Sequence, residues 1–302
     1  MIVVHQMAKV ASMAWVEAAR PVARQMGTMP IHTHFLTARN LQSIAAILAV
    51  APPDNTIVNP YMARSILRSG NRAVANIRAG RELGQRIRVI TGMRDPVARS
   101  LSLLAFFADF CGHSSRSLSA RDGADAHAVC ALLVELWRLV LARTAPAGSF
   151  ERLLWHMMGA YRNWFSEELA TVFDADIYSS PFPQGGGVQH LRGHDAQILV
   201  YRAEDMHPGA PPRSVVLDAA RQFLGAPGAA LTAVNTAATR RSYPLYVQAR
   251  NLFHLPAAML DEIYDEPVIR HFYGAREIAG FKLQWAAPRD SRTAFPAPSP
   301  DS

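Results

Sequence analysis

The stretch Ile2–Trp15, IVVHQMAKVASMAW, runs from a short apolar segment through a lysine and a serine into an alanine-rich segment. The apolar run Ile2–His5 predicts a buried strand, and residues Lys9–Met26 follow a helical period. A turn between a strand and a helix gathers backbone N–H groups and the positive end of the helix dipole, and this geometry binds anions. The stretch therefore predicts either a phosphate-binding turn or an ordinary strand–helix turn with one surface lysine. The Walker pattern GxxxxGK[ST] is absent, which disfavours a kinase or NTPase.

Strands and helices alternate along the rest of the chain. The pattern predicts strands at Met29–Leu36, Arg86–Thr91 and Gln197–Tyr201, and helices at Leu41–Ala49, Tyr61–Leu83, Val97–Phe110, Ala126–Arg143, Phe150–Phe173, Val215–Leu224 and Pro256–Tyr273. Such alternation is typical of an α/β, P-loop-like three-layer fold with a central parallel sheet flanked by helices. We expect one domain over residues 1–286 and a disordered Pro/Ser-rich tail over residues 287–302.

Composition limits the cellular setting and the class of ligand. The chain has 302 residues, and no apolar run reaches the roughly 20 residues of a membrane span. Neither a secretory signal nor a disulfide or metal framework is recognisable, so we expect a cytoplasmic protein without a metal. The net charge is +7 and comes mainly from arginine, which favours phosphate, sulfate and carboxylate. A nucleic-acid-binding protein is an alternative on charge alone, but no arginine-rich tract with interleaved aromatics supports it, and we expect no nucleic-acid partner.

A second candidate anion site lies in Arg88–Leu104, RVITGMRDPVARSLSLL. An apolar strand ends at Arg94, and Asp95 and Pro96 open a helix. Ser102 follows Arg94 by eight residues, so both side chains can reach one anion. The alternative is that Asp95 only caps the helix and Arg94 is solvated.

Together the two segments resemble sulfotransferases that use 3′-phosphoadenosine 5′-phosphosulfate (PAPS). In that superfamily a lysine-containing loop after the first strand holds the 5′-phosphosulfate, and an arginine and a serine eight residues apart hold the 3′-phosphate. The segment QMAKVAS is similar to the first motif, and RDPVARSLS is similar to the second. The resemblance implies a 5′ site formed by Gln6, Lys9, Val10, Ala11 and Ser12, and a 3′ site that includes Arg94 and Ser102.

The pair His32 and His34 in HTHFL supplies a candidate base. On a strand the two rings would face the same side of the sheet. A histidine can accept a proton near neutral pH, and a metal site would need a third ligand that the sequence does not place. The pair resembles the HxH motif of uronyl 2-O-sulfotransferases, which implies that one of the two rings is the base and leaves open which.

The last third of the chain carries a further resemblance. Its segments YRNWFSEELATVFDADIYSSPFP, ILVYRAEDM and IRHFYGAREIAGFKLQW are similar to a bacterial sulfotransferase-like family labelled as capsular polysaccharide synthesis proteins. From the residues alone, Trp164 is a core residue, and Glu204 and Asp205 are turn residues. The resemblance implies that the late basic pair Arg240 and Arg241 covers the 3′-phosphate; a solvated basic loop is the alternative.

The expected function is transfer of a sulfuryl group from PAPS to a hydroxyl, most simply on a carbohydrate of a capsule or cell surface. The loops His113–Asp125 and Ser179–Asp195 are expected to line the acceptor pocket because they are long and polar. The sequence departs from the superfamily at Ala11, where glycine is usual, and at Met13, where a hydroxyl residue is usual. These departures motivate one alternative, a catalytically degenerate PAP- or PAPS-binding protein. A P-loop kinase-like nucleotide-binding protein is a separate alternative.

Overall fold

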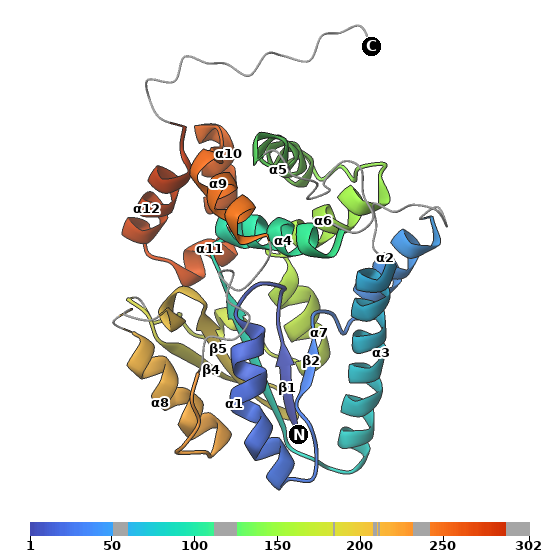
Figure 1. Cartoon of the computed structure of the whole chain (residues 1–302). Helices are drawn as coiled ribbons and strands as arrows, with labels where there is room; N and C mark the ends of the chain where they lie inside the picture. Colours follow the sequence, from blue (N-terminus) through green and yellow to red (C-terminus); the bar gives the residue numbers. More distant parts are fainter. Residues whose placement is uncertain are drawn as a thin grey trace, which may run out of the picture.

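The computed structural model describes residues 1–50, 60–111, 126–183, 185–207, 210, 212–231 and 242–287. Within these residues the centre of the fold is a five-stranded sheet in the order β2-β1-β3-β5-β4 (Figure 1). Neighbouring strands are parallel from β2 to β5, and only β4 runs antiparallel to its neighbour β5. The predicted α/β class, with a mostly parallel sheet flanked by helices, is confirmed. The strands are β1 Ile2–His5, β2 Ile31–Thr33, β3 Ile87–Met93, β4 Val188–Arg192 and β5 Ala196–Arg202.

Side chains of β1 alternate between two cores because successive residues of a strand point to opposite faces. Ile2 and Val4 pack in the core formed with helices α1 (Ser12–Gln25) and α8 (Arg213–Leu224). Val3 belongs to the larger core on the other face, which includes residues of α2 (Ala38–Ala49) and α3 (Pro60–Glu82). Figure 1 shows α1 and α8 together on one face of the sheet.

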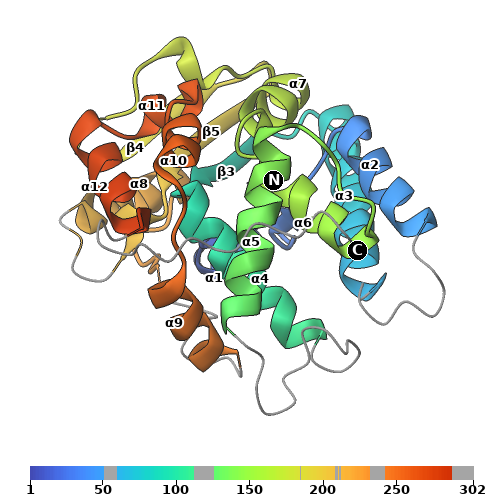
Figure 2. The same cartoon turned by 90° about the horizontal axis from the view of Figure 1, so that it is seen from above.

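A second group of helices lies beyond the carboxyl ends of the parallel strands (Figure 1). Helix α5 lies at the centre of this group and packs against α6, α9 and α10 (Figure 2). In open α/β sheets, ligands bind outside the carboxyl ends of the strands, so the junction between sheet and helices is the place to look for a site. The group comprises α4 Pro96–Cys111, α5 Ala126–Leu141, α6 Ser149–Gly159, α9 Tyr243–Leu252 and α10 Ala257–Tyr264, with α11 Pro267–Phe272 and α12 Ala275–Trp285 beside it.

The two segments after β1 and β2 differ from their predicted boundaries. The first helix begins at Ser12 rather than Lys9, because Lys9 and Ala11 have left-handed φ values of 71° and 63° that no right-handed helix contains. The second strand is limited to Ile31–Thr33 and does not fill the predicted range Met29–Leu36. His34 therefore lies just beyond the end of β2, where the chain turns towards α2.

The single helix predicted over Phe150–Phe173 is wrong. Helix α6 ends at Gly159, a turn follows, and the chain resumes as a π-helix at Phe165–Ala170 before the short α7, Thr171–Phe173. The wider π turn allows Phe165, Glu168 and Leu169 to be buried together. π-Helical turns are rare and occur frequently at functional sites, so Glu168 is of special interest.

Three elements were absent from the predicted set. Strand β4 lies inside Ser179–Asp195, which was expected to be a polar loop, and its alternation is masked because its buried positions are Gln189 and Leu191. Gln189 is tolerated there because its side-chain amide donates to the carbonyls of Ile177 and Ser180. Helices α9 and α12 were also missed.

Some predictions fall outside the described residues. These are the loop His113–Asp125, the pair Arg240 and Arg241, and the tail from residue 288. Across the part of the chain that the structure describes, no helix combines the length and the apolar character needed to cross a bilayer. The same residues contain no group of three or more His, Cys, Asp or Glu side chains arranged to hold a metal ion.

Candidate functional site

The loop between β1 and α1 has the backbone conformation expected of an anion-binding turn. Left-handed backbone at Lys9 and Ala11 flanks Val10, and such alternation of backbone hand turns successive N–H groups towards one point. The first turn of α1 carries no acidic side chain to neutralise the positive end of the helix. Lys9 is also one of only two lysines in a chain with 29 arginines, and a flexible ammonium acts as a compact point charge.

Two side chains from neighbouring strands hold this loop in place. Arg94, directly after β3, donates from Nη1 to the carbonyl of Lys9 at 3.0 Å. Tyr201, on β5, donates to the carbonyl of Val10, and its hydroxyl lies 2.9 Å from Oε1 of Gln6. Burial raises the pKa of Tyr201, so the hydroxyl keeps its proton and remains a donor. Both carbonyls are thereby turned back towards the sheet.

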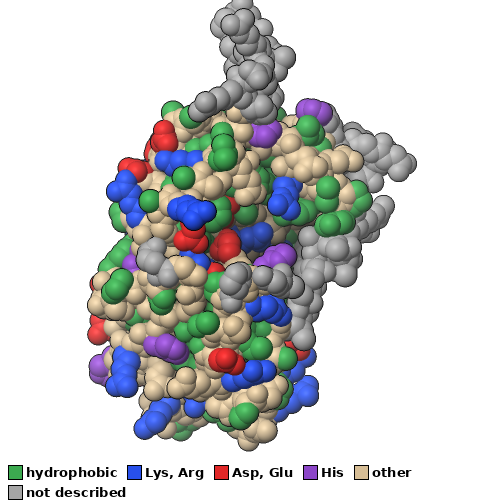
Figure 3. All heavy atoms as spheres, turned by 90° about the vertical axis from the view of Figure 1, so that its left-hand side faces the viewer, with side chains coloured by type: hydrophobic (Ala, Val, Ile, Leu, Met, Phe, Trp, Pro, Cys, Tyr) green, Lys and Arg blue, Asp and Glu red, His purple; other side chains and the backbone are tan. Residues whose placement is uncertain are grey.

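A cavity of about 830 Å³ opens above this loop, at the carboxyl ends of the strands. This volume is in the range of pockets that hold cofactors and drug-sized ligands. Seen from the side of α8 and α12, acidic side chains lie beside basic ones near mid-height of the molecule (Figure 3). Seven predicted site residues line the cavity although they come from three separate parts of the sequence: Lys9, Ala11, Ser12, His32, His34, Arg94 and Ser102.

Arg94 and Ser102 line the same cavity from the end of β3 and from α4. Asp95 between them is buried and caps α4, because its carboxylate accepts from the backbone N–H groups of Val97 and Ala98. It also accepts from Tyr264 at 2.6 Å and Trp285 at 2.8 Å. Asp95 is thus a structural cap, as one interpretation expected, while Arg94 is directed to the carbonyl of Lys9 rather than into solvent.

The geometry distinguishes His34 as the better base. Its Nδ1 lies 2.8 Å from the carbonyl oxygen of Gln6, which can only accept, so Nδ1 carries the proton. In the neutral ring Nε2 then keeps its lone pair and can accept a proton from a ligand. Burial lowers the pKa of His34 from 6.5, against the hydrogen bond to Gln6, and nearby charges such as Lys9 lower it further.

His32 lies beside His34, with ring centroids 5.0 Å apart and the rings nearly perpendicular. Burial, followed by the neighbouring His34 and His5, lowers the pKa of His32 to about 3. A group with that pKa is a weak base, so His32 is better suited to shaping the site than to removing a proton.

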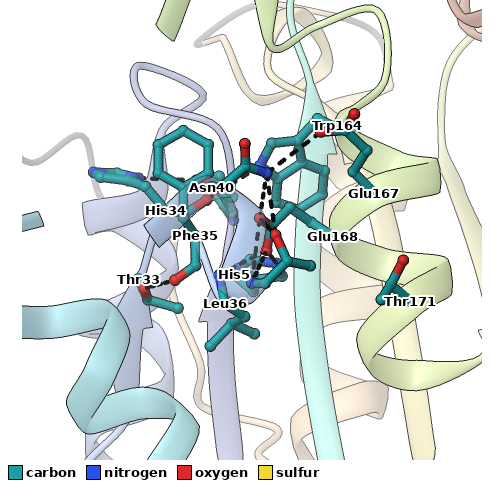
Figure 4. Close-up of polar contacts among 12 residues, drawn as sticks. His5, Thr33, His34, Phe35, Leu36, Asn40, Trp164, Glu167, Glu168 and Thr171 are labelled. Carbon is teal, nitrogen blue, oxygen red and sulfur yellow. Dashed lines mark hydrogen bonds and ion pairs between the residues drawn. The ribbon is translucent and has the colours of Figure 1, made fainter. Parts of the chain in front are cut away.

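A buried carboxylate fixes the turn from which His34 projects (Figure 4). Glu168, on the π-helix, is fully buried, and its carboxylate accepts from the backbone N–H groups of Leu36 at 2.6 Å and Thr37 at 3.2 Å. The Thr37 hydroxyl and the Asn40 amide donate to it as well, each at 2.7 Å. Burial alone would raise the pKa of Glu168, but the neighbouring His5 and the hydrogen bonds from Thr37 and Asn40 lower it, so the group is ionised.

Two further contacts complete this support. His5 Nε2, at the end of β1, lies 3.3 Å from the Glu168 carboxylate, and both side chains are inaccessible to solvent. Trp164, one turn before Glu168, donates from its indole N–H to the carbonyl of His34 at 3.2 Å. The backbone of His34 and the turn that follows it are therefore anchored to the π-helix.

The remaining predicted residues do not face the cavity or are not described. Gln6 and Val10 are fully buried and absent from the cavity wall; their polar groups meet Tyr201 and, for Gln6, His34. They support the loop instead of presenting side chains to a ligand. Arg240 and Arg241 lie outside the described residues.

Sequence reasoning missed three residues that shape the site. Glu168 and Tyr201 were present in quoted segments, but a buried acid and a strand tyrosine carry no local signal for contacts with residues about 130 and 190 positions away. Arg213 on α8 lines the cavity and donates to the carbonyls of Met206 and Leu231. Comparisons of the chain with protein-family models, with curated proteins and with solved structures found no match.

Replacing Ala11 with glycine should stabilise the protein. A left-handed backbone costs an L-residue about 1–2 kcal/mol, and glycine adopts it freely, although glycine also gives the unfolded chain more freedom, by about 0.4–1 kcal/mol. We expect A11G to increase the free energy of unfolding by up to about 1 kcal/mol, measured by urea denaturation.

The matched control is A18G, the same change inside α1, which should lower the free energy of unfolding by about 0.5–1 kcal/mol. If A11G destabilises the protein as A18G does, the left-handed backbone of Ala11 is not what the loop requires.

Glu168→Gln should destabilise the protein by about 1–3 kcal/mol, because an amide cannot accept from all the donors that now meet the carboxylate. The pKa of Glu168 is lowered on folding, so its contribution is complete above the unfolded value of 4.5 and disappears as the pH falls through the folded value. The difference between wild type and E168Q in urea denaturation should therefore shrink on acidification.

The neighbouring Glu167 provides the control, since it is only partly buried and its ion pair is with the exposed Arg39. E167Q should change the free energy of unfolding by less than about 0.5 kcal/mol. Equal effects of the two substitutions would contradict the assigned role of Glu168.

Proposed function

We propose that this protein is a PAPS-dependent sulfotransferase that transfers a sulfuryl group to a hydroxyl, with a carbohydrate acceptor favoured by the resemblance described above. The observation that carries the proposal is that one cavity gathers the Lys9 loop, the Arg94–Ser102 pair and His34. These are the chemical groups needed for a 5′-phosphosulfate, a 3′-phosphate and an acceptor hydroxyl. Their gathering supports the proposal because the three segments are far apart in the sequence.

In the proposed reaction the 5′-phosphate lies against the loop N–H groups and Ser12. The acceptor oxygen attacks sulfur, its proton passes to Nε2 of His34, and the S–O bond to the 5′-phosphate breaks. The leaving phosphate oxygen gains negative charge, which the ammonium of Lys9 stabilises. Fixed donors of this kind act before the reaction begins and need little reorganisation. Arg94 and Ser102 hold the 3′-phosphate and thereby select the sulfonucleotide.

One alternative keeps the ligand and removes the reaction. Ala11 occupies a left-handed position suited to glycine, and Met13 lines the cavity where the superfamily usually offers a hydroxyl. A protein with these departures can be a catalytically degenerate binder of PAP, the desulfated nucleotide. Tight PAP binding combined with no sulfate transfer from PAPS would favour this alternative.

PAP should stabilise the protein against unfolding. A ligand present at about 100 times its dissociation constant adds about 2.7 kcal/mol to the free energy of unfolding. We expect such an increase with PAP and a much smaller one with 5′-AMP, which lacks the 3′-phosphate, in thermal or urea denaturation. An equal effect of ATP with Mg²⁺, or no effect of PAP, would contradict the proposal, the former in favour of a kinase-like protein.

Substitutions of His34 and His32 should have different effects on kcat. His34→Gln is expected to reduce kcat by about 10²–10⁴-fold, the usual range for loss of a general base, and to leave PAP affinity unchanged. His32→Gln should have a smaller effect. Because the pKa of His34 is lowered and only the neutral ring accepts a proton, the wild-type rate should rise with pH on the acid side of 6.5 and then level off. A larger effect at His32 would reverse the assignment.

A further inference from the structure

The cavity has two sides, set by the strand order. β1 and β3 lie in the middle of the sheet, and they carry the Lys9 loop and Arg94. One side, next to β5, is lined by Met206, His207, Arg213 and Leu231. The opposite side, next to β2, is lined by His34 together with residues of α3, which packs against β2. Because the proposed base lies on the β2 side, the acceptor must enter there, and this inference rests on the proposed function.

The β2 side is bounded by one face of α3. Met62, Ser65, Ile66 and Ser69 line the cavity, and their spacing of three and four residues places them along one helical face. The Ser69 hydroxyl donates to the carbonyl of Ile66, which leaves its oxygen as an acceptor. The stripe is uncharged and combines two apolar with two hydroxyl side chains.

The part of α3 that lines the cavity is uncharged, whereas the helix as a whole is strongly basic. Helix α3 carries five arginines, and none of them lines the cavity. Arg64, Arg68 and Arg72 are all solvent-exposed. The helix thus presents its charge to water and an uncharged surface to the site.

Three further residues of the cavity wall are apolar as well. Leu103 and Phe106 of α4 and Met157 of α6 line the cavity. Lys9 lies close to these residues, with Nζ 4.6 Å from the centroid of the Phe106 ring. In the proposed reaction its ammonium interacts with the phosphosulfate. His32 is uncharged at neutral pH because its pKa is lowered to about 3 by burial and by its histidine neighbours. Among the described residues on this side, no further cation is available for an anionic acceptor.

We infer that the acceptor is an uncharged hydroxyl compound that places an apolar surface against α3 beside the reacting hydroxyl, such as a neutral sugar on an apolar aglycone. An acceptor carboxylate placed against the buried Ile66 would lose its hydration without gaining a partner, and an unpaired buried charge is strongly unfavourable. Apolar groups of the acceptor gain from contact with Met62, Ile66 and Phe106, while Ser65 and Ser69 can meet its hydroxyls. The inference therefore predicts that acidic polysaccharides are poor acceptors.

Three small glycosides test this inference on the full chain saturated with PAP. 4-Nitrophenyl β-D-glucoside and 4-nitrophenyl β-D-glucuronide differ only in a hydroxymethyl group against a carboxylate, and methyl β-D-glucoside lacks the aromatic ring. By calorimetry the nitrophenyl glucoside should bind at least about tenfold more tightly than either of the others. Equal or tighter binding of the glucuronide, or no binding of any of the three glycosides, overturns the inference.

A matched pair of variants tests whether the α3 stripe is what disfavours the glucuronide. Ser65→Arg places a cation on the exposed part of the cavity stripe, and Ala75→Arg places one on the same helix at an exposed position away from the cavity. S65R should improve glucuronide binding at least about tenfold, whereas A75R should not change it. Absence of PAP binding would remove the proposed function and this inference together. PAP binding with a preference for the glucuronide, or S65R behaving like A75R, would remove the inference alone.

Discussion

The carbonyl groups of Lys9 and Val10 are held by Arg94 and Tyr201, and the arrangement of the site depends on these hydrogen bonds. They join the loop after β1 to the ends of β3 and β5. Left-handed backbone at two L-residues costs about 1–2 kcal/mol each, while hydrogen bonds of this kind contribute about 0.5–1.5 kcal/mol each. The loop is therefore maintained by its neighbours. Gly92 on β3 is part of the same arrangement, because a Cβ there would lie 2.7 Å from the Tyr201 ring.

A second anchor acts on the opposite side of β1. The Glu168 carboxylate binds the turn after β2, and Trp164 binds the carbonyl of His34. The hydrogen bond from His34 to the carbonyl of Gln6 links this anchor to the Lys9 loop, since Gln6 also contacts Tyr201. A continuous set of polar contacts thus runs from the π-helix through β1 to β5. It fixes the ring of His34 relative to the loop, and the proposed in-line transfer would require such a fixed geometry.

Local patterns predicted the parts of this protein whose physical cause is local. The apolar runs of β1, β3 and β5 and the capping sequence after Arg94 each carry their own signal, and the parallel sheet brings the ends of β1, β2 and β3 together. The supports of the site were not predictable in this way. Glu168 is a buried acid, a rare occurrence that pattern reasoning assigns to a surface, and its partners are 128 to 132 residues distant. The same holds for β4, whose buried glutamine conceals the alternation.

The absence of glycine from the first turn illustrates how sequence and structure combine. From the sequence, Ala11 is only a departure from a motif. In the structure Ala11 adopts a left-handed conformation that glycine would adopt freely, so the loop takes this shape without glycine at a cost in stability. Alanine at position 11 therefore changes the stability of the loop more than its backbone conformation. That distinction is what makes an anion-binding loop without glycine physically reasonable here.

The central claim is that the Lys9 loop and the Arg94–Ser102 pair bind the two ends of one sulfonucleotide. A crystal structure of the full chain with PAP tests this most directly. The account predicts the 5′-phosphate against the backbone N–H groups of residues 10–12 and near Nζ of Lys9, with the 3′-phosphate hydrogen-bonded to Arg94 and Ser102. A nucleotide bound elsewhere, or bound with its 3′-phosphate in solvent, would contradict it.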